Sequence, residues 1–170
     1  ERVNELADRL IALYSSRAKI DGFAFQPDDD EQRRFEDAFP YELTTDQKVC
    51  LEEIKSDMEK PIAMDRLLSG DVGFGKTELA FRACYKAILS GKQAAILCPT
   101  TLLARQHYEV AVERFKAFGT QIAIFSRLVP EDVQKREMED VLSGKIDLVI
   151  GTHRLLSKEI KFRDLGLLVV

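Results

Sequence analysis

A glycine-rich stretch, LLSGDVGFGKTE, contains the residues with the clearest chemical potential in the chain. Gly70, Gly75, Lys76 and Thr77 match the pattern GxxxxGK[ST] at every fixed position. Glycines tolerate unusual backbone angles, so successive amide N–H groups can surround phosphate oxygens at a helix N-terminus. Lys76 is then expected to reach the β- and γ-phosphates, and the Thr77 hydroxyl to bind Mg²⁺. A chance match is disfavoured, because a predicted strand precedes the motif and a predicted helix follows it.

The loop alone does not distinguish a kinase, a GTPase, an ATPase and a motor. The upstream stretch FPYELTTDQ contains a residue that could recognise the base of the nucleotide, Gln47. The Gln47 amide has one donor and one acceptor side, which complement adenine N7 and N6. Phe39 or Tyr41 could stack on the base. Gln47 also has a structural alternative, because it forms a capping box with Thr44 at a predicted helix start. With the phosphate loop beside it, we favour base reading, and the two roles compete for one side chain.

The predicted ATP site therefore has a base side and a phosphate side. Its members are Phe39, Tyr41, Gln47, Gly70, Asp71, Val72, Gly73, Phe74, Gly75, Lys76, Thr77 and Glu78. Lys76 and Thr77 are its expected catalytic residues, and Thr77 is its expected metal ligand. A guanine-reading NKxD motif is not found in the sequence, which argues against a GTPase.

Strands alternate with helices from residue 44 onward, and this order must position the site. Strands are expected over residues 64–70, 93–99, 121–126, 146–152 and 165–170. Helices are expected over about 45–59, 76–89 and 101–117, and from Pro130 to near Gly144. This alternation predicts an α/β fold, a parallel sheet with helices on both faces and ligands at the carboxyl ends of the strands.

Residues 1–38 are expected to form a helical N-terminal segment, separate from a lobe over 39–170. Positions 1–14 place Val3, Leu6 and Leu10 at helical spacing. A short acidic helix should follow Pro27 and end before Pro40.

Composition narrows the class of protein further. The chain has 170 residues, of which 45% are hydrophobic and 32% charged. No apolar run is long enough to span a membrane and no leader is recognisable, so we expect a cytoplasmic protein. The first residue is Glu and both ends look cut, so we expect a piece of a longer protein. Cys50, Cys84 and Cys98 have no metal-site spacing, so we expect buried, reduced thiols. The net charge of −4 gives no support for DNA binding, although one basic face could provide it.

Four stretches, FPYELTTDQ, MDRLLSGDVGFGKTE, PTTLLARQHYE and IGTHRLLSKEIKFRDLGLL, occur in this order. They closely resemble the first motor lobe of the bacterial transcription-repair coupling factors, a family of superfamily-2 DNA translocases. RecG branch-migration helicases have a related motor. The resemblance covers residues 39–170 strongly. It implies a RecA-like P-loop NTPase lobe of an ATP-dependent translocase that displaces stalled RNA polymerase and couples transcription to nucleotide excision repair.

The resemblance also implies partners. These are the double-stranded DNA backbone, a second motor lobe, and RNA polymerase and repair factors bound through domains outside this chain. The expected DNA contacts are Thr100, Thr101, Arg105, Arg127, Thr152, His153 and Arg154. Hydroxyl and guanidinium groups suit phosphate oxygens without reading sequence. Thr100 has an alternative role as a helix N-cap, and Thr152 a similar one beside a turn.

Hydrolysis in such motors also needs an Asp-Glu pair after a strand like LGLLVV, and arginine fingers from the second lobe. The chain contains neither, so we expect a lobe truncated before the Mg²⁺-binding acidic motif, inactive as an isolated fragment. The alternatives are a RecG-type lobe, a non-catalytic nucleotide-binding fragment, or a P-loop kinase or GTPase.

Overall fold

The computed structural model describes residues 7, 10–12, 15 and 21–170. The helix expected over residues 1–14 falls mostly outside them and stays a prediction. From residue 21 onward the elements are α2 (Asp30–Asp37), α3 (Thr45–Met58), α4 (Lys76–Leu89), β1 (Gln93–Leu97), α5 (Thr101–Phe115), η1 (Lys116–Phe118), β2 (Ile122–Phe125), α6 (Glu131–Ser143), β3 (Leu148–Gly151), η2 (His153–Leu156) and β4 (Leu165–Val169).

Four parallel strands form one sheet in the order β2-β3-β1-β4. Ile150 of β3 is paired with Ile96 of β1 on one side and with Ile124 of β2 on the other. Parallel strands need crossover connections, which run here through α5, α6 and η2. The strands therefore end at the same edge of the sheet, where the segments after β1, β2 and β3 gather.

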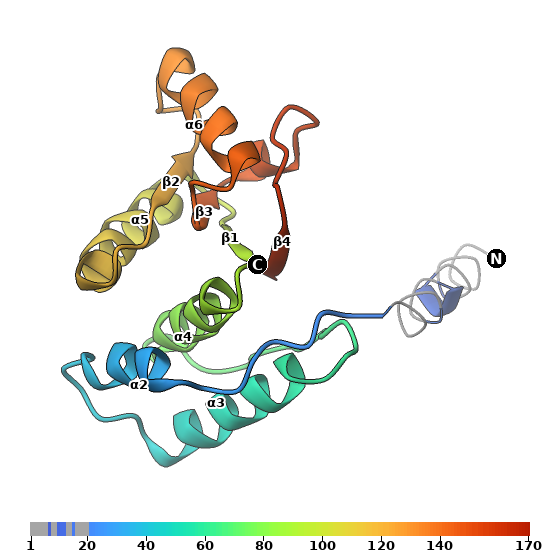
Figure 1. The fold of residues 1–170 in the computed structure, drawn as a ribbon, viewed down its shortest axis with the longest axis vertical. Helices are drawn as coiled ribbons and strands as arrows, with labels where there is room; N and C mark the ends of the chain where they lie inside the picture. Colours follow the sequence, from blue (N-terminus) through green and yellow to red (C-terminus); the bar gives the residue numbers. More distant parts are fainter. Residues whose placement is uncertain (1–6, 8–9, 13–14, 16–20) are drawn as a thin grey trace.

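Helices cover both faces of the sheet, and Figure 1 shows α4 and α6 on opposite sides of it. α4 and α5 pack on one face, over a core that includes Ile96 and Ile150. α6 and η2 pack on the other face, over Phe125 and Val149. β3 is buried along its whole length, as expected of a central strand covered on both sides. The predicted α/β fold with a parallel sheet is confirmed.

The strand expected at residues 64–70 is absent from the described structure, so that prediction was wrong. Leu67 is 90% exposed instead of buried. Arg66 forms ion pairs with Glu53 (2.7 Å) and Asp57 (2.5 Å) of α3. The segment therefore lies along α3, because its three apolar residues, Met64, Leu67 and Leu68, are interrupted by two charged residues and followed by Ser69 and Gly70, which disfavour a strand.

α3 begins as expected, and the apolar stripe expected on it, Val49, Cys50, Ile54 and Met58, is confirmed in its second half. Ile54 and Met58 are buried. Val49 is exposed and Cys50 only half-buried, and Leu51 is buried beside them instead. Cys50 and Leu51 both lie one turn before Ile54, so periodicity alone did not decide which of the two meets the core.

The other two cysteines are buried, as predicted. Burial raises the pKa of the Cys84 thiol to about 12, because the thiolate would lose its hydration there. Cys98 lies directly after β1, and burial raises the pKa of its thiol as well. Both thiols therefore stay protonated and unreactive at neutral pH.

The acidic helix predicted after Pro27 is α2, with Asp29 as its N-cap. Its Phe35 is fully buried and stacks on Tyr85 of α4, with ring centroids 4.3 Å apart. Lys86 of α4 donates to Asp28 and Glu59, at 2.7 Å each. Figure 1 shows α2 lying alongside α4, and Phe25 and Phe35 belong to the same buried core as the residues of α4. None of the described helices is long and apolar enough to cross a membrane.

Candidate functional site

The phosphate-loop residues form a tight turn directly before α4. Gly73 and Gly75 have φ values of +86° and +81°, in the left-handed region that favours glycine. The Phe74 N–H donates to the Asp71 carbonyl at 3.1 Å and closes the turn. Gly75 is the N-cap of α4 and has no side chain to satisfy the first helical amides. The loop therefore presents the amides of Lys76 and Thr77 at a bare helix N-terminus, which fits a phosphate group.

The Lys76 ammonium lies over this loop and donates to two of its carbonyl groups. Its Nζ is 2.6 Å from the Gly70 oxygen and 2.7 Å from the Asp71 oxygen. These bonds hold the cation within the turn where phosphate oxygens would bind. A phosphate can replace the two carbonyls as acceptor without moving the lysine to another site.

The remaining loop residues differ in their orientation. Val72 is fully exposed, and Asp71 is exposed beside it, whereas Thr77 is half-buried in the first turn of α4. The Glu78 carboxylate is buried and binds Arg82 and Arg114 instead of facing the loop. Among the described residues, no group of three His, Cys, Asp or Glu side chains is placed to hold a metal ion.

Gln47 connects the start of α3 to the phosphate loop. Its Oε1 accepts from the Thr44 N–H at 2.7 Å, and the Gln47 N–H donates to Thr44 Oγ1 at 3.3 Å, so the predicted capping box is confirmed. Its Nε2 donates to the Phe74 carbonyl. A Cβ atom at Gly75 would lie 2.6 Å from Gln47 Nε2, so this contact also requires glycine. Both sides of the amide are therefore engaged, one by the cap and one by the loop.

The aromatic residues upstream of Gln47 form an edge-to-face pair. The ring centroids of Phe39 and Tyr41 lie 5.5 Å apart, at an interplanar angle of 68°. Phe39 is half-buried, whereas Tyr41 is 73% exposed. The pair therefore has an inner ring held by the protein and an outer ring accessible to a ligand.

The expected DNA contacts lie at the ends of three neighbouring strands. Thr100 and Thr101 follow β1, Arg127 follows β2, and the segment 152–154 follows β3. The order β2-β3-β1 places these segments side by side along one edge. The fold therefore brings the residues predicted from separate motifs to a common edge of the sheet.

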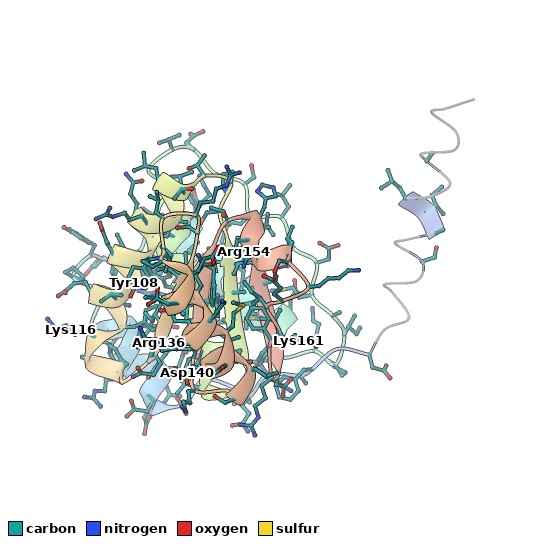
Figure 2. All side chains as sticks on the ribbon, turned by 90° about the horizontal axis from the view of Figure 1, so that it is seen from above. Tyr108, Lys116, Arg136, Asp140, Arg154 and Lys161 are labelled. Atoms are coloured by element: carbon teal, nitrogen blue, oxygen red, sulfur yellow. The ribbon has the colours of Figure 1, made fainter. Side chains whose placement is uncertain are left out.

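Local contacts already occupy several of these groups. The Thr100 hydroxyl accepts from the Leu103 N–H at 3.2 Å, so Thr100 is the N-cap of α5. Arg105 pairs with Glu109 at 2.9 Å, and Arg154 with Glu159 at 2.7 Å. Figure 2 looks onto α6 and shows Arg154 beside this helix.

The other groups at this edge have freer side chains. Within residues 21–170, Arg127 and His153 are exposed and make no ion pair, and the Thr152 hydroxyl makes no cap bond to η2.

His107 of α5 is half-buried, and burial lowers the pKa of its imidazole, which keeps the ring neutral near pH 7.

Sequence reasoning missed two residues of the site, Arg82 and Arg114. Both bind the Glu78 carboxylate next to Thr77. One signal was available for Arg82, which lies four residues after Glu78 on the same face of α4. Arg114 lies on α5, and its sequence position gives no sign of the contact.

A glycine-rich phosphate loop opening a helix, on a parallel sheet covered by helices on both faces, defines a RecA-like P-loop nucleotide-binding lobe. The model of the DEAD/DEAH box helicase family matches residues 44–170, and the chain belongs to this family.

The chain is also similar to transcription-repair-coupling factors. It is 51% identical to that of Bacillus subtilis (strain 168) over 168 residues, covering 99% of this chain and 14% of the relative. The protein of Staphylococcus haemolyticus is 51% identical over 170 residues, covering 100% of this chain and 14% of the relative. The chain therefore spans about a seventh of the length of these relatives. The resemblance read from the four sequence stretches is confirmed.

A solved structure has the same fold. The structure of RecG bound to a three-way DNA junction superimposes with a TM-score of 0.86 at 34% identity, covering 92% of this chain and 22% of that one. The RecA-like fold predicted through the resemblance is confirmed.

Proposed function

We propose that the chain is the ATP-gripping lobe of a longer, cytoplasmic, double-stranded DNA translocase that displaces stalled RNA polymerase and couples transcription to nucleotide excision repair. The observation that carries this proposal is the link between Gln47 and the phosphate loop. This bond joins the residue proposed to recognise adenine to the loop proposed to bind the phosphates. The comparison that supports the proposal is the identity of about 50% to transcription-repair-coupling factors.

On the phosphate side, the residues present fit ATP with Mg²⁺. The amides at the start of α4 and the Lys76 ammonium would hold the phosphates, and the Thr77 hydroxyl would bind the metal. Mg²⁺ supplies charge neutralisation between the phosphates when it is bound. Lys76 would exchange the Gly70 and Asp71 carbonyls for phosphate oxygens, at a similar distance and with stronger charge pairing.

On the base side, Gln47 would bind adenine in addition to its present partners, the Phe74 carbonyl and the Thr44 N–H. Its Nε2 would donate to N7, and its Oε1 would accept from N6. The amide has a second N–H on Nε2 and a second lone pair on Oε1, so capping and base reading can share one side chain.

At the strand ends, the loops after β1, β2 and β3 would hold the DNA backbone. Within residues 21–170, the members with no side-chain hydrogen bond or ion pair, and so able to reach phosphates directly, are Thr101, Arg127, Thr152 and His153. Arg105 and Arg154 would first have to leave Glu109 and Glu159. Such contacts neutralise phosphates without reading bases, which suits a motor that moves along any sequence.

The rest of the reaction requires other parts of the longer protein. A second motor lobe would supply arginine fingers, and an acidic pair would complete the Mg²⁺ site. RNA polymerase and repair factors would bind outside this lobe. We therefore propose that the isolated chain binds nucleotide and does not turn it over.

A RecG-type branch-migration motor is the second candidate, because the solved RecG structure has the same fold. The identity of 34% to RecG is lower than the 51% to the coupling factors, which favours the first proposal.

Lys76→Ala in the longer protein tests the proposal and separates the two candidates. The unsubstituted protein should displace a stalled RNA polymerase when ATP is added, and Lys76→Ala should abolish displacement while DNA binding persists. A matched control is Lys116→Ala, an exposed lysine on η1 that pairs with Glu113. Wild-type displacement by Lys76→Ala would refute the assignment of the loop. Unwinding of branched DNA without polymerase displacement by the unsubstituted protein would favour the RecG-type motor.

A further inference from the structure

A buried cluster of charged side chains lies one residue beyond the expected Mg²⁺ ligand. Glu78, in the first turn of α4, is only 7% exposed. Its Oε1 accepts from Arg82 Nε at 2.8 Å and from Arg114 Nη2 at 2.8 Å. Its Oε2 accepts from Arg114 Nε at 3.0 Å. We call Glu78, Arg82 and Arg114 the Glu78 cluster. It joins the phosphate-loop helix to α5 through short charge-assisted bonds.

The same two arginines hold the segment that ends α2. Arg114 Nη2 donates to the Phe35 carbonyl at 2.7 Å, and Arg82 Nη2 donates to the Glu36 carbonyl at 3.3 Å. Arg82 Nη1 also lies 3.4 Å from a carboxylate oxygen of Glu36. The chain just before Phe39 is therefore attached to the first turns of α4.

Both guanidinium groups also contact the Phe39 ring. The Cζ atoms of Arg82 and Arg114 lie 5.7 Å and 5.5 Å from its centroid. Guanidinium groups at this distance attract the electron-rich face of a ring, more strongly where water is excluded. Tyr41 in turn rests edge-on against Phe39. The orientation of both rings therefore depends on the Glu78 cluster.

The chain that runs from Phe39 to Gln47 is attached at its second end as well, by a contact between Gln47 and the phosphate loop. Gln47 reaches the Phe74 carbonyl, one residue before the Gly75 N-cap of α4. Phe39 is thus attached to the first turns of α4, and Gln47 to the loop that precedes it. The stretch between them, which carries Tyr41, is fixed at both ends relative to the phosphate site.

We infer that Glu78, Arg82 and Arg114 are positioning residues that hold the Phe39–Tyr41 ring pair at a fixed place relative to the phosphate loop, so that adenine meets an ordered platform. The inference rests on the proposed ATP site and assigns a role to residues that do not touch the phosphates. Ordering the rings before binding avoids the entropy loss of ordering them afterwards. The cluster should therefore contribute to recognition of the base and not to recognition of the triphosphate.

The test compares two ligands that differ only in the nucleoside. Equilibrium binding of ATP and of inorganic tripolyphosphate, each with Mg²⁺, is measured by calorimetry on the 170-residue chain. The variant is Arg82→Met, which keeps the apolar stem and leaves Glu78 paired with Arg114. We expect ATP binding to weaken by about tenfold, while tripolyphosphate binding changes by less than about twofold.

Arg34→Met is a matched control. This arginine also lies over a ring, with its Cζ atom 5.9 Å from the Phe118 centroid, but it is exposed and does not belong to the Glu78 cluster. It should leave binding of both ligands unchanged.

Three other results would overturn the inference. They are unchanged ATP binding by Arg82→Met, an equal loss for both ligands, or the same loss of ATP binding in Arg34→Met. If Arg82→Met does not fold, as judged by its thermal transition, Phe39→Leu decides the question in the same two measurements, with the same expected selective loss. A wild-type chain that binds neither ligand would overturn the proposed ATP site itself, and with it this inference.

Discussion

Gln47 can be tested for its two roles separately, because its amide makes one bond for the helix cap and another for the loop. Gln47→Ala removes the bond to the Thr44 N–H and the bond to the Phe74 carbonyl. Each contributes about 1 kcal/mol to the free energy of unfolding, so the loss should be about 2 kcal/mol. For a chain of 170 residues, this corresponds to a decrease in Tm of roughly 4–8 °C.

Gln47→Glu is the informative partner of that variant. A carboxylate at this position can still accept from the Thr44 N–H, so the capping box stays intact. It cannot donate to adenine N7 or to the Phe74 carbonyl, and it places a negative charge beside that oxygen. The decrease in Tm should be about half that of Gln47→Ala, yet ATP binding should weaken by at least as much, about tenfold in either variant.

The assay combines thermal unfolding with equilibrium binding of ATP and GTP. Base reading predicts that both variants lose the preference for ATP over GTP. Thr44→Ala serves as the control, because it weakens the cap from the other side and keeps the amide of Gln47. It should lower Tm and retain the preference. If Gln47→Ala lowers Tm as expected but binds ATP as tightly as wild type, the residue is a cap and nothing more, and the reasoning is refuted.

Three further predictions concern turnover, acid stability and DNA. The isolated chain should hydrolyse ATP at background rate, and DNA-stimulated turnover in a steady-state assay would contradict the need for a second lobe. Burial alone would raise the pKa of Asp28, but hydrogen bonds from Lys55 and Lys86 outweigh it and hold that pKa below its usual value. The ionised Asp28 therefore stabilises the fold above about pH 4, and this stabilisation is lost as the pH falls through the lowered pKa. Asp28→Asn should flatten the acid side of a plot of Tm against pH. An unchanged plot would exclude this linkage. In the longer protein, Arg127→Ala should weaken binding to all duplex sequences equally and reduce the slope of log K against log salt concentration by about 1. Lys145, which pairs with Asp140 of α6, provides the control, because Lys145→Ala should leave this slope unchanged. A loss that depends on the DNA sequence would argue against a backbone contact.

Local features of the site could be predicted from the sequence because their causes are local. The left-handed glycines, the bare start of α4 and the Thr44–Gln47 box all follow from residues close together in the chain. The parallel sheet also followed from short apolar runs between helical stretches. Local pattern could not decide which residue in the first turns of α3, Cys50 or Leu51, would be buried with Ile54 and Met58.

The wrong strand prediction has a different physical origin. Residues 64–70 contain only three apolar side chains, and Arg66 pairs with Glu53 and Asp57 of α3. The contact between Glu78 and Arg114 likewise joins two elements, α4 and α5, and one sequence read alone carries no signal of it. The place of Glu78 in the ATP site stays a prediction.

The strand order β2-β3-β1-β4 also has a consequence for how the chain folds. β1 is the first strand of the part of the chain that the structure describes, but both of its neighbours come much later, since Ala94 pairs with Leu148 and with Leu167. Until β3 exists, β1 has no strand partner and can be protected only by packing against α4 and α5. Pairing at such sequence separation slows folding and leaves apolar strand edges exposed for longer. The apolar stretch QAAIL is therefore without a strand partner during part of folding, when it is prone to aggregation.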